Sequence, residues 1–278
     1  MAYGKRCPAI TREFAMNLLR RSIISILIPL AGVGFLWPFF VSSQEVAHLA
    51  SWFFVASTTI SIFLIVTLVA NDDLGSKNVA FLGILSALIA ALRPLGIGAI
   101  GIEPMWFALI LASRALGPTF GFLVGALSMS LSALLTGGIG PWLGYQVFAA
   151  ALIGFGVGVI PPNLRGRSEI FALSLYGIFA AELFGILMDL QFWPWSLGTG
   201  TELSYRAGAP FAENLSHFFS YHFLSALAWD IPRALITVLL IFIAGKPALI
   251  ALRRARHRAA FVTDIEFREL ADVRLNHR

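Results

Sequence analysis

Hydrophobic residues fill most of this chain in long blocks, and short groups of polar, Gly and Pro residues separate the blocks. An α-helix needs about 17 to 23 such residues to cross a bilayer. Eight membrane helices are predicted, over Ser22–Val41, Ala50–Ala70, Val79–Leu92, Met105–Leu116, Pro118–Thr136, Trp142–Ile160, Glu169–Leu190 and His222–Ala244. The third and fourth are too short to cross about 30 Å of hydrocarbon alone, so we expect loop segments to complete them around a cavity. The pattern therefore predicts an all-α integral membrane protein.

The pattern divides the chain into three parts. Residues 1–78 hold a polar, basic tail and the first two helices, residues 79–244 hold the other six, and residues 245–278 form a basic tail. The first helix is long enough to remain in the membrane, so no cleavable signal peptide is predicted. The C-terminal tail is expected to form an amphipathic helix on the inner leaflet.

Small residues recur at four-residue spacing in the predicted helices. They form four stripes: Gly83, Ala87 and Ala91; Gly117, Gly121 and Gly125; Gly154 and Gly158; and Gly177, Ala181 and Gly185. Residues four apart share one helix face, so each stripe makes a flat surface that a second helix can approach closely. Such a stripe serves either packing within the bundle of this chain or docking of another protein's helix.

The amino-acid composition excludes several classes of protein. Of the residues, 58% are hydrophobic and 13% are charged, which excludes a soluble globular domain and a disordered chain. The net charge is +5, but no basic patch interleaved with aromatic residues occurs, so nucleic-acid binding is not predicted. The single cysteine, Cys7, excludes an internal disulfide. The spacing of His, Cys and Asp residues gives no metal site, and no cofactor is predicted.

The basic residues predict the orientation. With the N-terminus inside, seventeen of the 20 Lys and Arg residues lie in inside segments, Arg93 and Arg206 lie outside, and Arg233 lies within a span. Cytoplasmic segments of membrane proteins carry an excess of Lys and Arg. An even number of spans, with both termini in the cytoplasm, is therefore predicted.

Three charged residues fall inside predicted spans: Glu182, Asp230 and Arg233. Charge is costly there, so we expect all three to face the bundle and to pair. Asp230 and Arg233 are three residues apart and can pair on one helix, which Pro232 is expected to kink. The group is either a structural ion pair or the polar floor of a ligand cavity.

The predicted outer ends carry the other candidate chemistry. Asp189 shares a helix face with Glu182 and lies near Trp193 and Trp195, which either line a pocket or anchor the chain at the membrane interface. No serine-hydrolase elbow, His-Glu-x-x-His motif or phosphate-binding loop is present. No enzymatic activity is predicted, and energy for uphill transport must come from an ion gradient or a separate ATPase.

Four sequence blocks carry a resemblance to a known family: ALIAALRPLG, ILASRALGPTFGFLVGALS, GGIGPWLGYQVFAAALIGFGVG and WDIPRALITVLL. On these blocks, residues 79–244 resemble the substrate-binding S component of energy-coupling factor (ECF) vitamin transporters, and look closest to cobalamin-type members. The resemblance implies a six-helix fold with a ligand pocket near the outer surface. The loops that roof it correspond to residues 93–103, 137–146 and 191–221. The two N-terminal helices depart from this six-helix pattern.

The resemblance also implies partners, namely a transmembrane T component and two ATPase subunits. The family docks its T component through an Ala-x-x-x-Ala motif, which Ala87 and Ala91 match and Gly83 extends. The ligand-binding residues are expected to be Arg93, Trp142, Gln146, Asp189 and Trp195. The expected function is a membrane-embedded binding subunit of an importer for a vitamin such as cobalamin, in a bacterial cytoplasmic membrane. The alternative is a stand-alone ion-coupled secondary transporter that uses Glu182, Asp230 and Arg233.

Overall fold

The structure, a computed structural model, describes residues 32, 34–40, 75–96, 101–140, 142–197 and 200–275, with side chains for all of these except 75–78 and 258–275. Within these ranges the chain is helical and contains no strand. The α-helices are α3 (Gly75–Leu92), α4 (Met105–Leu116), α5 (Pro118–Thr136), α6 (Leu143–Gly156), α7 (Gly166–Ser196), α8 (Phe211–Ser225) and α9 (Leu227–Leu275). Three short 3-10 helices are η1 (Trp37–Phe39), η2 (Pro94–Gly96) and η3 (Val157–Val159).

Six of the eight predicted spans correspond to helices of the structure. α4 and α5 have the predicted bounds, whereas α7 and α9 are longer than predicted. Four helices are long and apolar enough to cross a membrane, over Val79–Gly96, Pro118–Thr136, Gly166–Ser196 and Leu227–His257, and α4 and α6 are shorter apolar helices. Most of the first predicted span and all of the second lie outside the described residues. The all-α membrane fold predicted from the sequence is confirmed.

The segment between α7 and α9 differs from its prediction. Residues 191–221 were expected to form a long outer loop, but α7 continues to Ser196 and α8 begins at Phe211. His222, predicted to begin the eighth span, lies near the end of α8, and the span itself begins at Leu227. The helix α8 was missed because its polar residues break the hydrophobic pattern on which the span prediction rests.

Glycine stripes bring α5 and α6 into close contact. A side chain at Gly121 would overlap the carbonyl oxygen of Gly154, and one at Gly154 would overlap Gly121. One helical turn away, a side chain at Gly125 would overlap the backbone of Ala150. Two of the predicted stripes therefore pack within this chain, where they let two helix backbones nearly touch.

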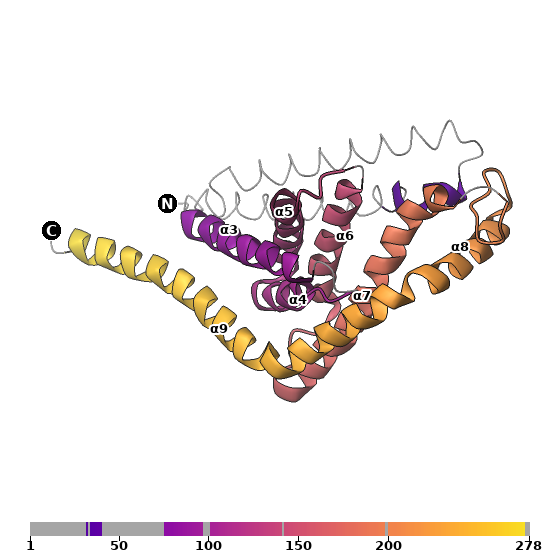
Figure 1. Cartoon of the computed structure of the whole chain (residues 1–278). Helices are drawn as coiled ribbons and strands as arrows, with labels where there is room; N and C mark the ends of the chain where they lie inside the picture. The colour runs from indigo at the N-terminus through magenta and orange to yellow at the C-terminus, as the bar shows by residue number, and fades with distance from the viewer. Residues whose placement is uncertain are drawn as a thin grey trace, which may run out of the picture.

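The stripe of α7 packs against α9 in the same way. A side chain at Gly177 would press on Thr237, and one at Gly185 would overlap the carboxylate of Asp230. Figure 1 shows these two helices side by side, with α9 continuing past α7 toward the C-terminus. Gly185 thus provides the room that a charged side chain needs at this helix contact.

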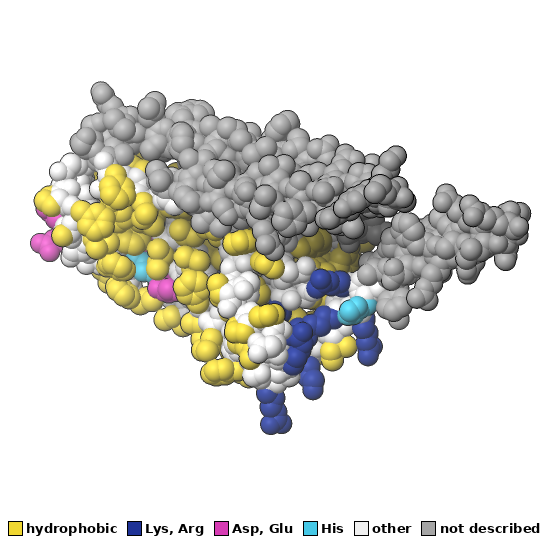
Figure 2. All heavy atoms as spheres, turned by 180° about the vertical axis from the view of Figure 1, so that it is seen from behind, with side chains coloured by type: hydrophobic (Ala, Val, Ile, Leu, Met, Phe, Trp, Pro, Cys, Tyr) yellow, Lys and Arg dark blue, Asp and Glu magenta, His cyan; other side chains and the backbone are white. Residues whose placement is uncertain are grey.

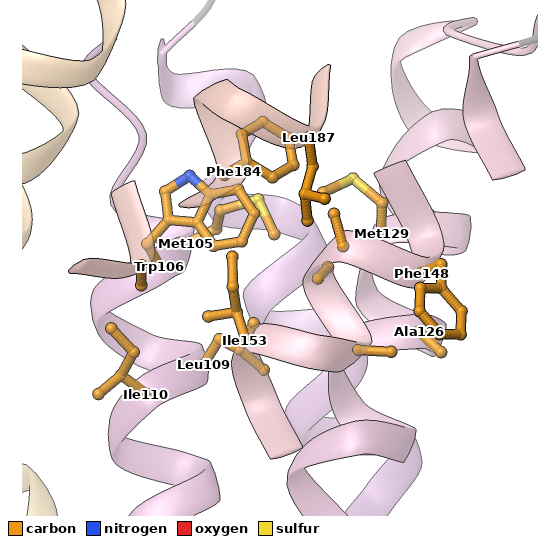
Figure 3. Close-up of a cluster of buried hydrophobic side chains, with 14 of the residues drawn as sticks. Met105, Trp106, Leu109, Ile110, Ala126, Met129, Phe148, Ile153, Phe184 and Leu187 are labelled. Carbon is orange, nitrogen blue, oxygen red and sulfur yellow. The ribbon is translucent and has the colours of Figure 1, made fainter. Parts of the chain in front are cut away.

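The hydrophobic core lies among α4, α5, α6 and α7. Figure 3 shows Trp106 of α4 against Phe184 of α7, and the centroids of their rings are 4.5 Å apart. Met129 of α5 and Ile153 of α6 are fully buried in the same cluster. The short helix α4 is thereby enclosed by longer helices.

One end of this bundle is held by a buried carboxylate, Glu169 at the start of α7. It accepts hydrogen bonds from Arg114 of α4, at 2.7 Å, and from Arg253 of α9, at 2.5 and 3.1 Å. Arg114 also donates to the carbonyl oxygens of Ile160 and Pro161. Arg114 and Arg253 were predicted to lie on the inner side, and we call the group of Glu169, Arg114 and Arg253 the inner clasp. Figure 2 shows the Lys and Arg side chains gathered toward one part of the surface, away from the acidic side chains.

Candidate functional site

At the opposite end of the bundle, Arg93 joins three elements. It follows the last residue of α3, and Pro94 begins the 3-10 turn η2 directly after it. Its guanidinium donates to Ser132 Oγ of α5 at 2.9 Å and to Gln146 Oε1 of α6 at 3.1 Å. Two residues predicted to bind ligand, Arg93 and Gln146, are therefore in direct contact.

Arg233 of α9 forms a second polar group nearby. Its Nε donates to Glu103 Oε2 at 2.8 Å, and its Nη1 donates to Asp230 Oδ1 on the same helix. Trp106 Nε1 also donates to Glu103 Oε2, at 2.7 Å. The Arg233 guanidinium lies 4.9 Å from the ring centre of Phe184, a cation–π contact. Arg233 thus ties the segment before α4 to α7 and α9.

The charge state of Glu103 follows from these contacts. Burial by itself raises the pKa of Glu103, but the charge of Arg233 and the hydrogen bonds from Trp106 and Arg233 outweigh it and hold the pKa below its ordinary value. Glu103 is therefore ionised near neutral pH.

His222 of α8 lies between two carboxylates of α7. Its Nδ1 is 2.8 Å from Asp189 Oδ2, and its Nε2 is 3.0 Å from Glu182 Oε1. Ser225 Oγ donates to the same Asp189 oxygen at 3.3 Å. Burial by itself lowers the pKa of His222, but the hydrogen bonds and charges of Asp189 and Glu182 raise it to about 9. We refer to Glu182, Asp189, His222, Asp230 and Arg233 together as the outer polar cluster.

Aromatic residues cover the same end of the molecule. Trp142 lies beside Phe192, and Trp195 beside Trp37, with ring centroids 6.5 and 5.9 Å apart. Trp193 is fully buried, and its Nε1 donates to the carbonyl oxygen of Leu203 at 2.7 Å. Trp142 and Trp195 are partly exposed, at 37% and 48%.

A family model described as ECF-type riboflavin transporter, S component, matches residues 73–254, which is more than half of the chain. The chain belongs to this family. Neither the curated proteins nor the solved structures contain a match. The sequence-based assignment to ECF S components is thereby confirmed, and the protein is a multi-pass membrane protein that serves as the substrate-binding subunit of an ECF transporter.

The predicted binding residues of this S component fall into separate contacts. Arg93 and Gln146 touch each other, Asp189 contacts His222, and the two tryptophans pack on other rings. Among the described residues, the direct partner of Glu182 is His222 rather than Arg233. All of these residues lie toward the end of the bundle that is opposite the inner clasp.

Two charged residues of the outer end were not singled out from the sequence. Glu103 pairs with a residue 130 positions away, and no local pattern indicates such a contact. His222 was predicted only as the first residue of the eighth span, and its acidic partners are 33 and 40 positions away. These partners could have been found from the sequence only by pairing basic and acidic residues that are predicted to lie at the same depth in the membrane.

The predicted docking stripe of the S component lies on the surface. Gly83, Ala87 and Ala91 are all exposed, and a side chain at Gly83 would meet nothing within 4 Å. The neighbouring Ile84 and Leu88 are exposed as well, at 66% and 56%. This face of α3 therefore differs from the stripes of α5, α6 and α7, which pack inside the chain.

Proposed function

We propose that this S component captures a vitamin at the outer side of a bacterial cytoplasmic membrane and works with a T component and two ATPase subunits as an importer. The observation that carries this proposal is the family match over residues 73–254. The absence of catalytic motifs from the sequence agrees with a binding subunit whose energy comes from separate ATPases.

The proposed ligand site uses Arg93, Trp142, Gln146, Asp189 and Trp195. Aromatic rings with a few polar groups are the usual lining of a small-molecule site. The family description names riboflavin, a planar ring system with a polyhydroxyl chain, which such a lining suits. Riboflavin is therefore the first ligand to test, and cobalamin, which the sequence blocks suggested, is the second.

Binding to the purified full chain tests this proposal. Riboflavin binding quenches or shifts flavin fluorescence, so affinity can be measured directly, and cobalamin can be measured by its absorbance. We expect Ala substitution of at least two of the five residues to weaken binding at least tenfold, or about 1.4 kcal/mol. Arg206→Ala is the matched control, because Arg206 is an outer arginine whose ion pair with Glu213 is exposed.

Unchanged affinity in all five Ala variants would place the ligand site elsewhere. Failure of both vitamins to bind would leave the S-component family intact but exclude these two ligands. The two failures are therefore distinguishable.

The second candidate is the ion-coupled secondary transporter. The observation that favours it is the outer polar cluster, in which Asp230, Arg233 and His222 are buried together. Proteoliposomes that contain only this chain separate the two candidates. Uptake driven by a proton or sodium gradient alone supports the secondary transporter, whereas uptake that requires the T component, the ATPases and ATP supports the importer.

A further inference from the structure

Three side chains of the outer polar cluster are arranged like metal ligands. Glu182 of α7, His222 of α8 and Asp230 of α9 each offer one oxygen or nitrogen atom, and these atoms all lie within 4.8 Å of one another. The three helices are joined elsewhere by packing, so the backbone holds this arrangement in place. The spacing along the sequence did not reveal it.

An unpaired oxygen within the cluster is a second, independent observation. Asp230 is only 2% exposed, and its Oδ1 accepts a hydrogen bond from Arg233, but its Oδ2 has no hydrogen-bond partner. A buried carboxylate oxygen without a donor is costly, and native structures normally satisfy such an atom with a donor, a water or an ion. A cation shared with Glu182 and His222 would satisfy it.

The orientation of His222 fits metal binding. Its Nδ1 faces Asp189, so its Nε2 faces Glu182. Histidine ligands in metal sites commonly donate one ring N–H to a carboxylate and bind the metal with the other nitrogen. The Nε2 to Glu182 Oε1 distance is 3.0 Å, close to the separation of two ligands that each bind one ion at about 2.1 Å.

The net charge of the outer polar cluster also favours a bound cation. His222 pairs with Glu182 and Asp189, and a carboxylate oxygen of Asp230 lies within 4.8 Å of it, whereas Arg233 is shared between Asp230 and Glu103. Without a further positive charge the cluster is negative, which is costly beside apolar surroundings. A proton on His222 supplies one such charge, and a divalent ion in place of the Nε2 proton supplies more.

We propose that Glu182, His222 and Asp230 bind a divalent transition-metal ion, with Asp189 orienting His222. One imidazole and two carboxylates suit ions of the zinc type better than magnesium or calcium, which prefer oxygen ligands alone. Three protein ligands leave a coordination position for water or for a donor atom of a ligand. This site does not depend on which vitamin the chain binds.

Cobalt binding tests the site directly. Tag-free full chain, freed of metal with a chelator, is titrated with Co²⁺ and followed by its visible absorption, and Zn²⁺ is added as a competitor. We expect one equivalent of Co²⁺ to bind and Zn²⁺ to displace it. His222→Gln and Glu182→Gln should weaken Co²⁺ binding at least tenfold, and Asp189→Asn should weaken it 10- to 100-fold.

The matched control is His217→Gln on the same helix, because His217 contacts only a backbone carbonyl among the described groups. This variant should bind Co²⁺ like the unaltered chain. Glu182 is partly exposed, with 43% of its side chain accessible, so Glu182→Gln is expected to fold even if the buried His222 variant does not. Failure of the unaltered chain to bind Co²⁺, or equal binding in the Glu182→Gln variant, would overturn the proposal.

Discussion

Arg233 shows which contacts of single residues the sequence predicts. Its pairing with Asp230 was expected, because residues three apart on a helix lie on one face. Its bond to Glu103 was not expected, because only the folded chain brings residue 103 to α9. The same holds for His222, whose partners come from another helix. The spacing of residues along the sequence therefore predicts ion pairs within one helix but does not predict ion pairs between helices.

The Glu103–Arg233 bond predicts a dependence of stability on pH. The pKa of Glu103 is held below its ordinary value of 4.5 in the folded chain, so the ionised carboxylate stabilises the fold above that value. This contribution is lost as pH falls through the folded pKa. We expect Glu103→Gln to lower the free energy of unfolding by about 2 kcal/mol at neutral pH, and the difference from the unaltered chain to shrink below pH 4.5.

Thermal unfolding of the detergent-solubilised chain across pH measures this effect. Glu213→Gln is the control, because its ion pair with Arg206 is exposed and should contribute little. A difference between Glu103→Gln and the unaltered chain that stays constant down to strong acid would contradict the assignment of the effect to the ionised carboxylate.

At the scale of helices, the small-residue stripes were predicted, but their partners were not. All four stripes are visible in the sequence, yet only the structure shows that α5 meets α6 and that α7 meets α9. The helix α8 was not predicted, because its polar side chains serve the adjoining segment. Asn214, for example, accepts from the backbone N–H of Arg206 and donates to its carbonyl oxygen. A sequence with polar residues of this kind is typical of a loop, and only the hydrogen-bond partners in the folded chain show that it forms a helix.

The exposed stripe of α3 carries the docking prediction. A tryptophan at Ala87 or Ala91 would keep a partner helix several ångströms away, because close backbone approach supplies the attraction between helices in lipid. We expect Ala87→Trp and Ala91→Trp to fold and to bind ligand, but to lose uptake and co-purification with a T component. Expression, ligand affinity and pull-down of the T component measure the three properties.

Two further tryptophan variants serve as controls for this experiment. Leu175→Trp adds the same ring at an exposed position of α7 and should leave all three properties unchanged. Gly154→Trp places it where α5 and α6 touch and should prevent folding. Loss of folding and of ligand binding in the α3 variants would show instead that this stripe supports the chain's own bundle.

At the scale of the whole molecule, charged groups meet at two opposite ends of the bundle. Residues assigned to the inner side, Arg114, Arg165 and Arg253, converge on Glu169. Arg93, assigned to the outer side, contacts Gln146 at the opposite end. Which of these ends faces the cytoplasm stays a prediction from the bias of basic residues, because that bias depends on composition rather than on contacts. The path of residues 191–221 could not be predicted in this way.

Cysteine labelling tests the orientation. In a Cys7→Ser background, a cysteine at Thr201 should react with an impermeant maleimide in intact cells, and one at Ser168 should react only after permeabilisation. Both positions are exposed, so a difference reports the side of the membrane rather than burial. Labelling of the Ser168 position from outside would invert the orientation.

The short segment 34–40 precedes the part of the chain that the family model matches. Phe35 and Trp37 are nonetheless buried, Phe35 against Tyr145 and Trp37 against Trp195 and Tyr205. Phe39 packs in the same manner on Trp193 and Phe218. The matched region is therefore not an interchangeable module. In a chimera that joins the matched region to the N-terminal part of another S component, these aromatic side chains would be exposed and prone to aggregation. The recipient would have to supply aromatic rings that cover them.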